Sequence, residues 1–251
     1  MSNTKLWEII KELKTENYSW VDLTHELSAE TPHWFGFKPL GIEKLFDYPD
    51  APMRVYQYTH PGQYGTHVDA PIHFDPNGRT LAEIRPDEMM YPLAVVDKSK
   101  EVEKNCDYVL TVDDLKEWEA ENGRFPEGSF VAFRTDWCKR APEVFDNNDE
   151  NEIPHCPGWD VEAIKWLVEE RNIGAIGHET ADTDPGLVTS DANNYPYPGE
   201  KYILDMDRIQ IELLANLDKV PAVGGLIVCS FPKLKDGTGY PARCFAIVPA
   251  K

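Results

Sequence analysis

The sequence lacks the features that place a protein in a membrane, on nucleic acid or outside the cell. No apolar run approaches the ~20 residues that span a bilayer, and the N-terminal MSNTKLWEIIKELK has no short apolar core of a secretion signal. Basic residues are scarce: 25 Lys and Arg stand against 44 Asp and Glu, and the net charge of −19 repels phosphate backbones and anionic lipids. We therefore expect a cytoplasmic protein that binds neither nucleic acid nor a membrane.

Several common catalytic and structural motifs are also missing. The five cysteines are odd in number and contain no CxxC pair, which disfavours a disulfide framework and a thiolate zinc site. There is no GxSxG elbow, phosphate-cradling glycine loop or HExxH pair, so serine-hydrolase, nucleotide-binding and zincin functions have no support. We expect the cysteines to be small core residues: Cys106, Cys138, Cys156, Cys229 and Cys244.

Length and hydrophobic patterning predict one α/β domain over residues 1–251. Hydrophobic residues make up 41 % of the chain, enough to bury one substantial core. Because helical segments separate several apolar runs, we expect an α/β or mixed-sheet arrangement. Short apolar runs bounded by turn residues predict buried strands at 92–97, 129–134, 175–177, 224–229 and 244–248.

Helix signals occur in three places. Thr111 with Asp114 predicts the start of one helix, and Asp160 predicts the start of another, which Gly174 should end. Residues 20–60 mix aromatic residues with Pro and Gly, as in loops and short strands. An N-terminal amphipathic helix is predicted to bury the face formed by Leu6, Ile9, Ile10 and Leu13.

One short segment concentrates groups that bind metals. From Gln63 to Phe74 the chain reads QYGTHVDAPIHF. On an extended backbone alternate side chains share a face, so His67, Asp69 and His73 would point the same way as Gln63. Imidazole nitrogen with carboxylate and amide oxygen suits zinc, manganese or iron. The spacing also fits a strand with surface histidines and a turn-forming or helix-capping aspartate, so spacing alone does not decide.

The same segment resembles the HxGTHxDxPxH signature of the cyclase-like metal hydrolases, a family that includes bacterial kynurenine formamidase and isatin hydrolase. Every signature position except the first is matched. The resemblance implies a swivelling β/α/β-type fold, with a central mixed sheet or barrel surrounded by helices, assembled as a homodimer or homotetramer. Further similar stretches cover most of the chain: Asp22-Leu23-Thr24-His25, Gly177-His178-Glu179-Thr180, Asp184-Pro185-Gly186, Asn216-Leu217-Asp218 and Pro241-Ala242-Arg243.

The resemblance implies a divalent metal site. It makes His67 and Asp69 metal ligands and His73 the general acid/base. At the first signature position the chain has Gln63, whose amide oxygen is a weaker, uncharged donor.

Two downstream glutamates bear on the number of ions. Where the formamidase branch has a His ahead of a Glu, this chain has Glu200 and Glu212. If two ions bind, Asp69 bridges them and the glutamates complete the second site. An oxygen-rich donor set favours manganese over zinc. One or two ions per chain both remain open.

The implied chemistry is hydrolysis. A bound divalent ion lowers the pKa of its water to about 7 and polarises a carbonyl, while His73 moves the proton to the leaving group. We therefore expect the opening of a small amide, linear or cyclic, and Gln63 places the chain nearer to isatin hydrolase than to the formamidases. The alternatives are a lactone hydrolase, a cyclase or dehydratase that uses the same groups without consuming water, and a non-catalytic metal- or ligand-binding protein.

Four further residues are candidates for substrate contact. Trp34, Phe35 and Phe37 are predicted to wall the pocket, with core packing as the alternative. His178 follows a predicted strand, where loops often carry functional groups; a hydrogen-bonded structural role is the alternative. The acidic run at 146–152 reads as a solvated loop. The other histidines have no partner at ligand spacing: His25, His33, His60 and His155.

Overall fold

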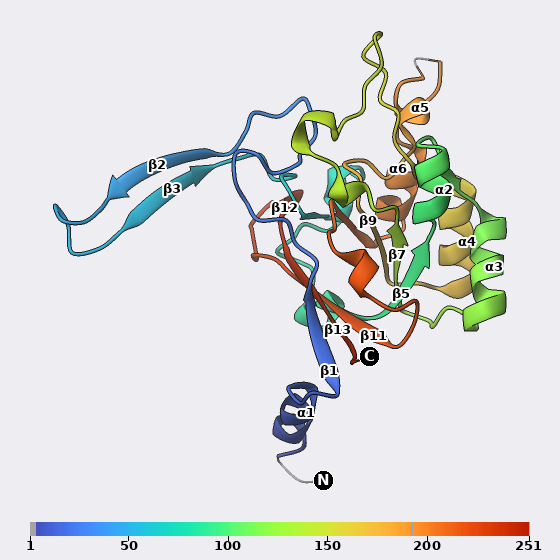
Figure 1. The fold of residues 1–251 in the computed structure, drawn as a ribbon, viewed down its shortest axis with the longest axis horizontal. Coiled ribbons are helices and arrows are strands. Elements are labelled where there is room, and N and C mark those ends of the chain that lie inside the picture. Colours follow the sequence, from blue (N-terminus) through green and yellow to red (C-terminus); the bar gives the residue numbers. More distant parts are fainter. Residues whose placement is uncertain (1–3, 192, 251) are drawn as a thin grey trace.

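A nine-stranded mixed sheet organises the computed structural model, which describes residues 4–191 and 193–250 (Figure 1). The central strands β5, β7, β9 and β10 run parallel, and antiparallel strands extend the sheet on both sides. The five strands predicted from apolar runs correspond to β5, β7, β9, β11 and β13. In sheet order the strands are β1 (Tyr18–Asp22), β13 (Arg243–Pro249), β11 (Gly225–Ser230), β5 (Met90–Asp97), β7 (Phe130–Arg134), β9 (Ala175–His178), β10 (Ile209–Glu212), β4 (His67–Asp69) and β12 (Gly239–Pro241).

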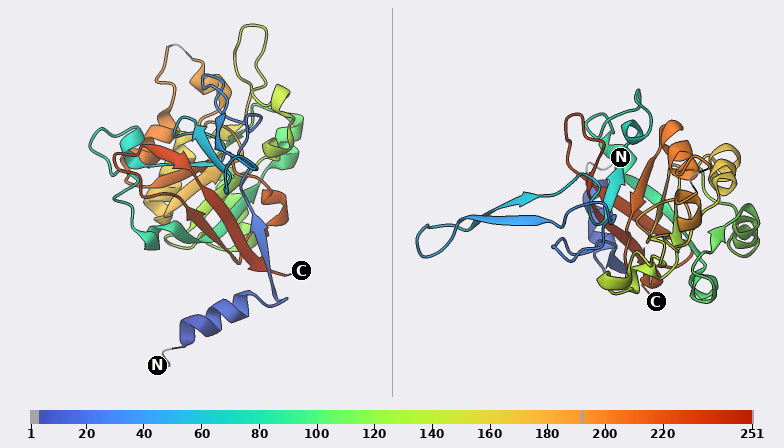
Figure 2. Two further views of the ribbon diagram at one scale, coloured as in Figure 1. Left: turned by 90° about the vertical axis from the view of Figure 1, so that its left-hand side faces the viewer. Right: turned by 90° about the horizontal axis from the view of Figure 1, so that it is seen from above.

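The two faces of the sheet have separate hydrophobic clusters. In β5, Leu93 and Val95 join one cluster, whereas Ala94 and Val96 join the other, as the two-residue period of a strand requires. The first cluster joins strands from both ends of the sheet, because the sheet curls into a half-barrel (Figure 2). The mixed α/β class is therefore confirmed. The second face is covered by α2 (Ser99–Lys104), α3 (Val112–Asn122), α4 (Val161–Arg171) and α6 (Pro198–Asp205).

Helices α3 and α4 begin where the sequence predicts. Thr111 Oγ1 accepts from the Asp114 backbone N–H at 3.3 Å, and Asp114 Oδ2 accepts from the Thr111 N–H at 2.8 Å. Asp160 accepts a backbone N–H of the first turn of α4 at 3.0 Å. The predicted end at Gly174 is wrong, because α4 ends at Arg171 and is capped by Asn172, which takes the left-handed conformation with φ 49°. Asparagine tolerates this conformation, so no glycine is needed.

The N-terminal helix α1 (Lys5–Leu13) forms as predicted, but its predicted burial is wrong. Leu6 is 74 % exposed and Ile10 is 50 % exposed. Figure 1 shows that α1 lies at the end of β1, away from the sheet. Periodicity reports that one helix face is apolar; it does not report what covers that face.

A second projection is the hairpin of β2 (Gly41–Phe46) and β3 (Val55–Thr59), which extends from the body in Figure 1. It lies in the region predicted to hold loops and short strands. Within residues 4–191 and 193–250, no helix is long and apolar enough to cross a membrane. The remaining elements are β6 (Val109–Leu110), β8 (Gly158–Trp159), α5 (Gly186–Thr189) and the 3₁₀ turns Pro71–His73, Pro86–Met89, Trp137–Lys139, Pro142–Val144 and Leu217–Lys219.

Candidate active site

The metal-binding segment is not one continuous strand, contrary to the prediction. Only β4 is extended; Gly65 before it has φ 62°, and a 3₁₀ turn begins directly after Ala70. Pro71 fits the first position of that turn because its fixed φ suits helical backbone and no N–H is lost. The turn carries His73 back toward Asp69. The predicted residues still converge on one pocket, which is lined by Gln63, His67, Asp69 and His73.

Strand pairing brings the downstream glutamates to this segment. In the antiparallel pair β4–β10, Glu212 lies opposite His67. Helix α6, which precedes β10, carries Glu200 to the same pocket. His67 Nε2 is 3.4 Å from both Asp69 Oδ2 and Glu212 Oε2. All five residues predicted to bind metal therefore line one cavity: Gln63, His67, Asp69, Glu200 and Glu212.

The side chains form two overlapping groups of potential metal ligands. One consists of His67, Asp69 and Glu212, and the other consists of Asp69, His73 and Glu200. His73 Nε2 is 4.0 Å from Asp69 Oδ1 and 3.8 Å from Glu200 Oε1. Asp69 belongs to both groups, which is the arrangement that a bridging carboxylate between two ions requires.

The cluster crowds three buried carboxyl groups together. Asp69, Glu200 and Glu212 are each at most 5 % exposed. Among the described residues, the basic groups within 4.0 Å of their oxygens are imidazoles only, those of His67, His73 and His178. Burial, together with repulsion between the carboxylates, raises the pKa of Glu200 and Glu212 well above the usual value. Burial opposes ionisation of Asp69 too, but the nearby His67 imidazole outweighs it and lowers the pKa of Asp69 to about 2.

These residues fit a divalent cation. Asp69 Oδ1 is buried and has no hydrogen-bond partner among the described residues, whereas an anionic oxygen is stable in that environment only beside a cation or donor. Gln63 donates through Nε2 to Thr238 Oγ1 at 3.1 Å, which leaves its amide oxygen as a further donor to a metal. Imidazole nitrogens with several carboxylate oxygens suit manganese or zinc.

Gln210 is a central residue that the sequence analysis missed. Its Nε2 lies 3.1 Å from a carboxylate oxygen of each of Asp69, Glu200 and Glu212. Thr183 Oγ1 donates to Gln210 Oε1 at 2.7 Å and fixes the orientation of the amide. The sequence did carry a signal, because residues two apart on a strand share a face and Gln210 precedes Glu212 by two.

His178 lies beneath the pocket and does not line it. It is fully buried, and its Nε2 is 3.4 Å from Glu212 Oε1. Trp159 Nε1 donates to His178 Nδ1 at 3.3 Å. Burial lowers the pKa of His178 to about 3, so the imidazole is neutral. Direct contact between His178 and the substrate stays a prediction, which this geometry does not support. The contacts of His178 fit a residue that positions Glu212.

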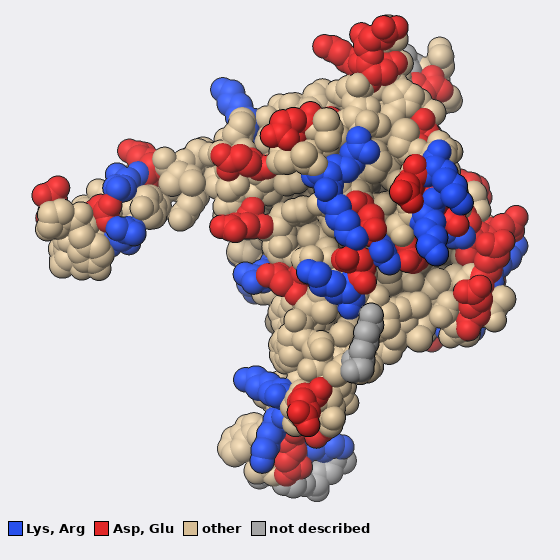
Figure 3. All heavy atoms as spheres, viewed as in Figure 1, with Lys and Arg blue, Asp and Glu red and all other residues tan. Residues whose placement is uncertain are grey.

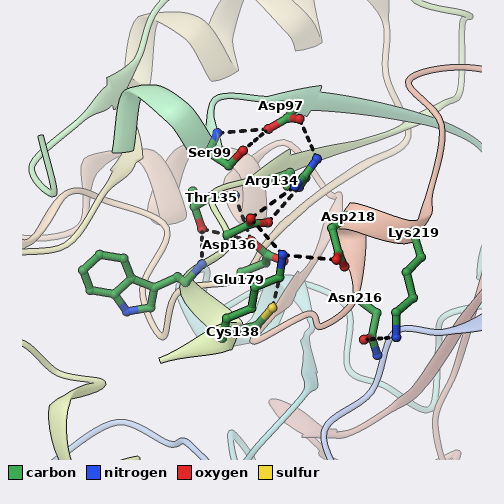
Figure 4. A network of polar contacts seen from close by, with 12 residues as sticks. Asp97, Ser99, Arg134, Thr135, Asp136, Cys138, Glu179, Asn216, Asp218 and Lys219 are labelled. Atoms are coloured by element: carbon green, nitrogen blue, oxygen red, sulfur yellow. Dashed lines mark hydrogen bonds and ion pairs between the residues drawn. The ribbon is translucent and has the colours of Figure 1, made fainter. Parts of the chain in front are cut away.

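The neighbouring Glu179 anchors the end of β9 to the segment after β7 (Figure 4). Glu179 Oε2 accepts from the backbone N–H of Thr135 at 2.8 Å and from its hydroxyl at 3.1 Å. The Cys138 thiol donates to Glu179 Oε1 at 3.1 Å. Burial raises the pKa of Glu179. This network fixes the backbone on which His178 sits.

Aromatic side chains wall two adjoining cavities. Trp34 and Phe37 line the pocket that contains the carboxylates. Phe35, which is 58 % exposed, lines the adjoining cavity together with Trp137 and Phe145, but not the pocket that contains the carboxylates. None of the three predicted aromatic residues belongs to the hydrophobic core, so the core-packing alternative is wrong.

Asp182 is a second residue that the sequence analysis missed. It lines both cavities, as do Trp34 and Tyr197. Burial and the nearby Asp184 raise the pKa of Asp182 to about 7. His25, by contrast, lines a separate cavity with residues of the C-terminal segment.

Comparison with known proteins identifies the family to which this site belongs. The model of the Cyclase family matches residues 21–185. Isatin hydrolase of Roseibium aggregatum is 35 % identical over 216 residues, which cover 83 % of this chain and 81 % of that protein. Kynurenine formamidase of Bacillus mycoides is 25 % identical over 167 residues, 66 % of this chain and 70 % of that protein.

Two solved structures share the fold over nearly the whole chain. Isatin hydrolase A from Ralstonia solanacearum has a TM-score of 0.91 at 35 % identity and covers 99 % of this chain and 98 % of its own. An isatin hydrolase bound to the product analogue thioisatinate has a TM-score of 0.90 at 32 % identity, covering 99 % and 100 %. The chain therefore belongs to the Cyclase family and is a metal-dependent hydrolase of carbon–nitrogen bonds other than peptide bonds.

Proposed function

We propose that this enzyme opens a small cyclic amide of the isatin type and yields a carboxylate. The observation that carries the proposal is the position of the buried imidazole–carboxylate cluster in a pocket walled by Trp34, Phe37 and Tyr197. Flat aromatic walls suit a bicyclic aromatic lactam. The 35 % identity to an isatin hydrolase supports this substrate class.

We assign the metal to the converging ligands. His67, Asp69 and Glu212 would hold one ion, with Gln63 as a further oxygen donor, and Asp69 and Glu200 would contribute to a second. The oxygen-rich set favours manganese over zinc. When bound, a divalent ion lowers the pKa of water to about 7 and polarises a carbonyl oxygen.

His73 is the proposed general acid/base. Its side chain is 32 % exposed, unlike the buried His67, so it reaches both the pocket and solvent. It would take the proton of the attacking water and return it to the leaving nitrogen. Phe74 packs edge-on against the His73 ring, with 4.9 Å between centroids, and limits its rotation.

The test is turnover of isatin by the manganese-loaded enzyme in ¹⁸O-labelled water. Ring opening with one ¹⁸O atom in the new carboxylate supports hydrolysis. A product formed without label would instead indicate the cyclase or dehydratase alternative. If isatin is inert but aromatic lactones are opened with label, the hydrolase chemistry stands and the amide assignment is wrong.

We also propose that the chain assembles as a homodimer or homotetramer. Support comes from α1 and the β2–β3 hairpin, which project from the body (Figure 1) and whose large apolar side chains are exposed. On the body, acidic and basic side chains are intermixed (Figure 3). Light scattering should give a multiple of the chain mass that falls when both projections are made polar. The exposed apolar residues include Leu6, Trp7, Ile42, Phe46 and Tyr58.

The thiols support the proposal of a cytoplasmic location. All five cysteines are free, including Cys229 and Cys244, which face each other across β11 and β13. Free thiols persist in reducing compartments. Fractionation of cells that produce the protein tests the location.

A further inference from the structure

A second cluster of metal-ligating groups lies away from the active-site carboxylates, where two distant segments meet. The short strands β6 and β8 pair in parallel, with Val109 opposite Gly158. Cys106 and Asp107 form the turn before β6, and His155 lies three residues before β8. The Gly158 backbone N–H donates to Tyr108 O at 3.2 Å and closes this junction.

Three different donor types converge there. Ligand atoms of Cys106, Asp107 and His155 all lie within 4.8 Å of one another, and the Asp107 Oδ2 to His155 Nδ1 distance is 2.8 Å. On a tetrahedral zinc ion, bonds of about 2.0–2.3 Å separate the ligand atoms by about 3.5 Å. Small side-chain movements therefore bring the donors to ligand spacing. All three residues are half-buried, so an ion can reach them from solvent.

The surrounding backbone holds these donors in place. Asn147 Nδ2 donates to His155 O at 2.7 Å, and the His155 N–H donates to Asn147 O at 3.3 Å. The Asp107 N–H donates to Asn105 Oδ1 at 3.2 Å. Asp149 Oδ2 lies 4.0 Å from His155 Nε2, on the other side of the ring. A carboxylate at the second nitrogen is the usual partner of a ligating histidine, because it fixes the tautomer.

We propose that Cys106, Asp107 and His155 form a second site for a thiophilic divalent cation, Zn²⁺ or Cd²⁺, with Asp149 orienting His155. The thiolate distinguishes this site chemically from the oxygen-rich active-site cluster. On binding, the Cys106 thiol proton and any proton shared by His155 and Asp107 pass to solvent, so affinity rises with pH. Asp107 lies 48 positions from His155, so this pair has no signal at ligand spacing in the sequence.

An occupied site would hold the loop that borders the substrate cavities. The loop leaves the junction at Asn147 and returns at His155, and Asn148, Glu152 and Pro154 line the cavity beside the active site. The ion would tie this loop to the turn before β6. The existence of the site does not depend on the proposed activity.

The test is a Cd²⁺ titration of the manganese-loaded enzyme, followed by the ultraviolet charge-transfer band of a cadmium–thiolate bond. We expect a saturable band at one equivalent, lost in C106S, and binding weakened at least tenfold in H155A and D107N. C138S is the matched control, because Cys138 is also half-buried but bonds to Glu179, and it should keep the band. Exchange of manganese for cadmium in the active site gives no such band, since no thiolate belongs to that cluster.

Three outcomes would overturn the proposal. The first is no band in the wild type, and the second is a band that survives in C106S. The third is a band that is lost in C106S while H155A and D107N bind Cd²⁺ as tightly as the wild type, which indicates a lone thiol. Circular dichroism of each variant establishes that it is folded, and C106A replaces C106S if the serine variant is not.

Discussion

Asp184 links the stability of the metal-free protein to pH. Its carboxylate accepts the backbone N–H groups of Gly199 at 2.7 Å and Glu200 at 3.0 Å, and so holds the first turn of the helix that carries Glu200. Burial raises the pKa of Asp184 from 3.8 to about 6 despite these two hydrogen bonds. Asp184 is 1 % exposed, so solvent screens this effect little.

The sign of this pH dependence follows from how tightly Asp184 binds its proton in the folded and in the unfolded protein. Between the ordinary pKa of 3.8 and the folded-state pKa of about 6, folded Asp184 keeps its proton while the unfolded residue is ionised. Stability therefore falls as pH rises through this interval and levels off above it. A shift of about two pKa units corresponds to about 3 kcal/mol. In the variant D184N the amide does not titrate, so its stability relative to wild type should rise by about 2.4 kcal/mol from pH 4 to pH 7, most of the full effect.

Urea unfolding of the metal-stripped proteins at pH 4, 5, 6 and 7 measures this difference. Removing the Asp184 charge also lowers the pKa of Asp182 and Glu200, and this adds to the rise in the relative stability of D184N with pH. The lost helix contact lowers the stability of D184N by about 1 kcal/mol at every pH. A difference that stays constant within about 0.5 kcal/mol, or that falls with pH, would refute the assignment of a raised pKa to Asp184.

Three further predictions concern catalysis, metal binding and folding. H73A should lower kcat by about a hundred- to ten-thousand-fold while elemental analysis finds wild-type metal content, and unchanged kcat would remove His73 from the mechanism. Manganese at a hundred times its Kd should stabilise the stripped enzyme by about 2.7 kcal/mol, seen as a rise in Tm; no rise would mean that the carboxylate cluster does not bind it. T111A should cost about 1 kcal/mol in urea unfolding through loss of the α3 cap. T189A serves as the comparison, because Thr189 is the last residue of α5 and caps no helix N-terminus.

Local patterns predicted much of the fold. The apolar runs located β5, β7, β9, β11 and β13, and the Thr111–Asp114 pair located the start of α3, because those signals depend only on neighbouring residues. The burial of α1 was predicted wrongly, since a helix face reports its own polarity but not its partner. The curl of the sheet came from the family resemblance, because strand order depends on contacts far apart in the sequence.

The site was predicted only where its residues are close in sequence. His67, Asp69 and His73 stood out within seven positions, although a turn, and not a continuous strand, brings them together. Gln210 was missed because amides are common and its three carboxylate partners come from separate elements. The contact between Asp107 and His155 has no local signal at all, since it arises from the pairing of β6 with β8.

The most direct test of the central claim measures metal content and isatin turnover in the same preparations. The C106S enzyme and the same enzyme with the further changes Q63A/H67A/D69A are compared by plasma mass spectrometry, so that the proposed thiolate site contributes to neither. We predict one or two manganese ions per chain in the C106S enzyme, with turnover, and loss of both metal and turnover in the triple variant. A C106S enzyme that stays metal-free and inert after addition of Mn²⁺ and Zn²⁺, or a triple variant that keeps metal and activity, would contradict the account.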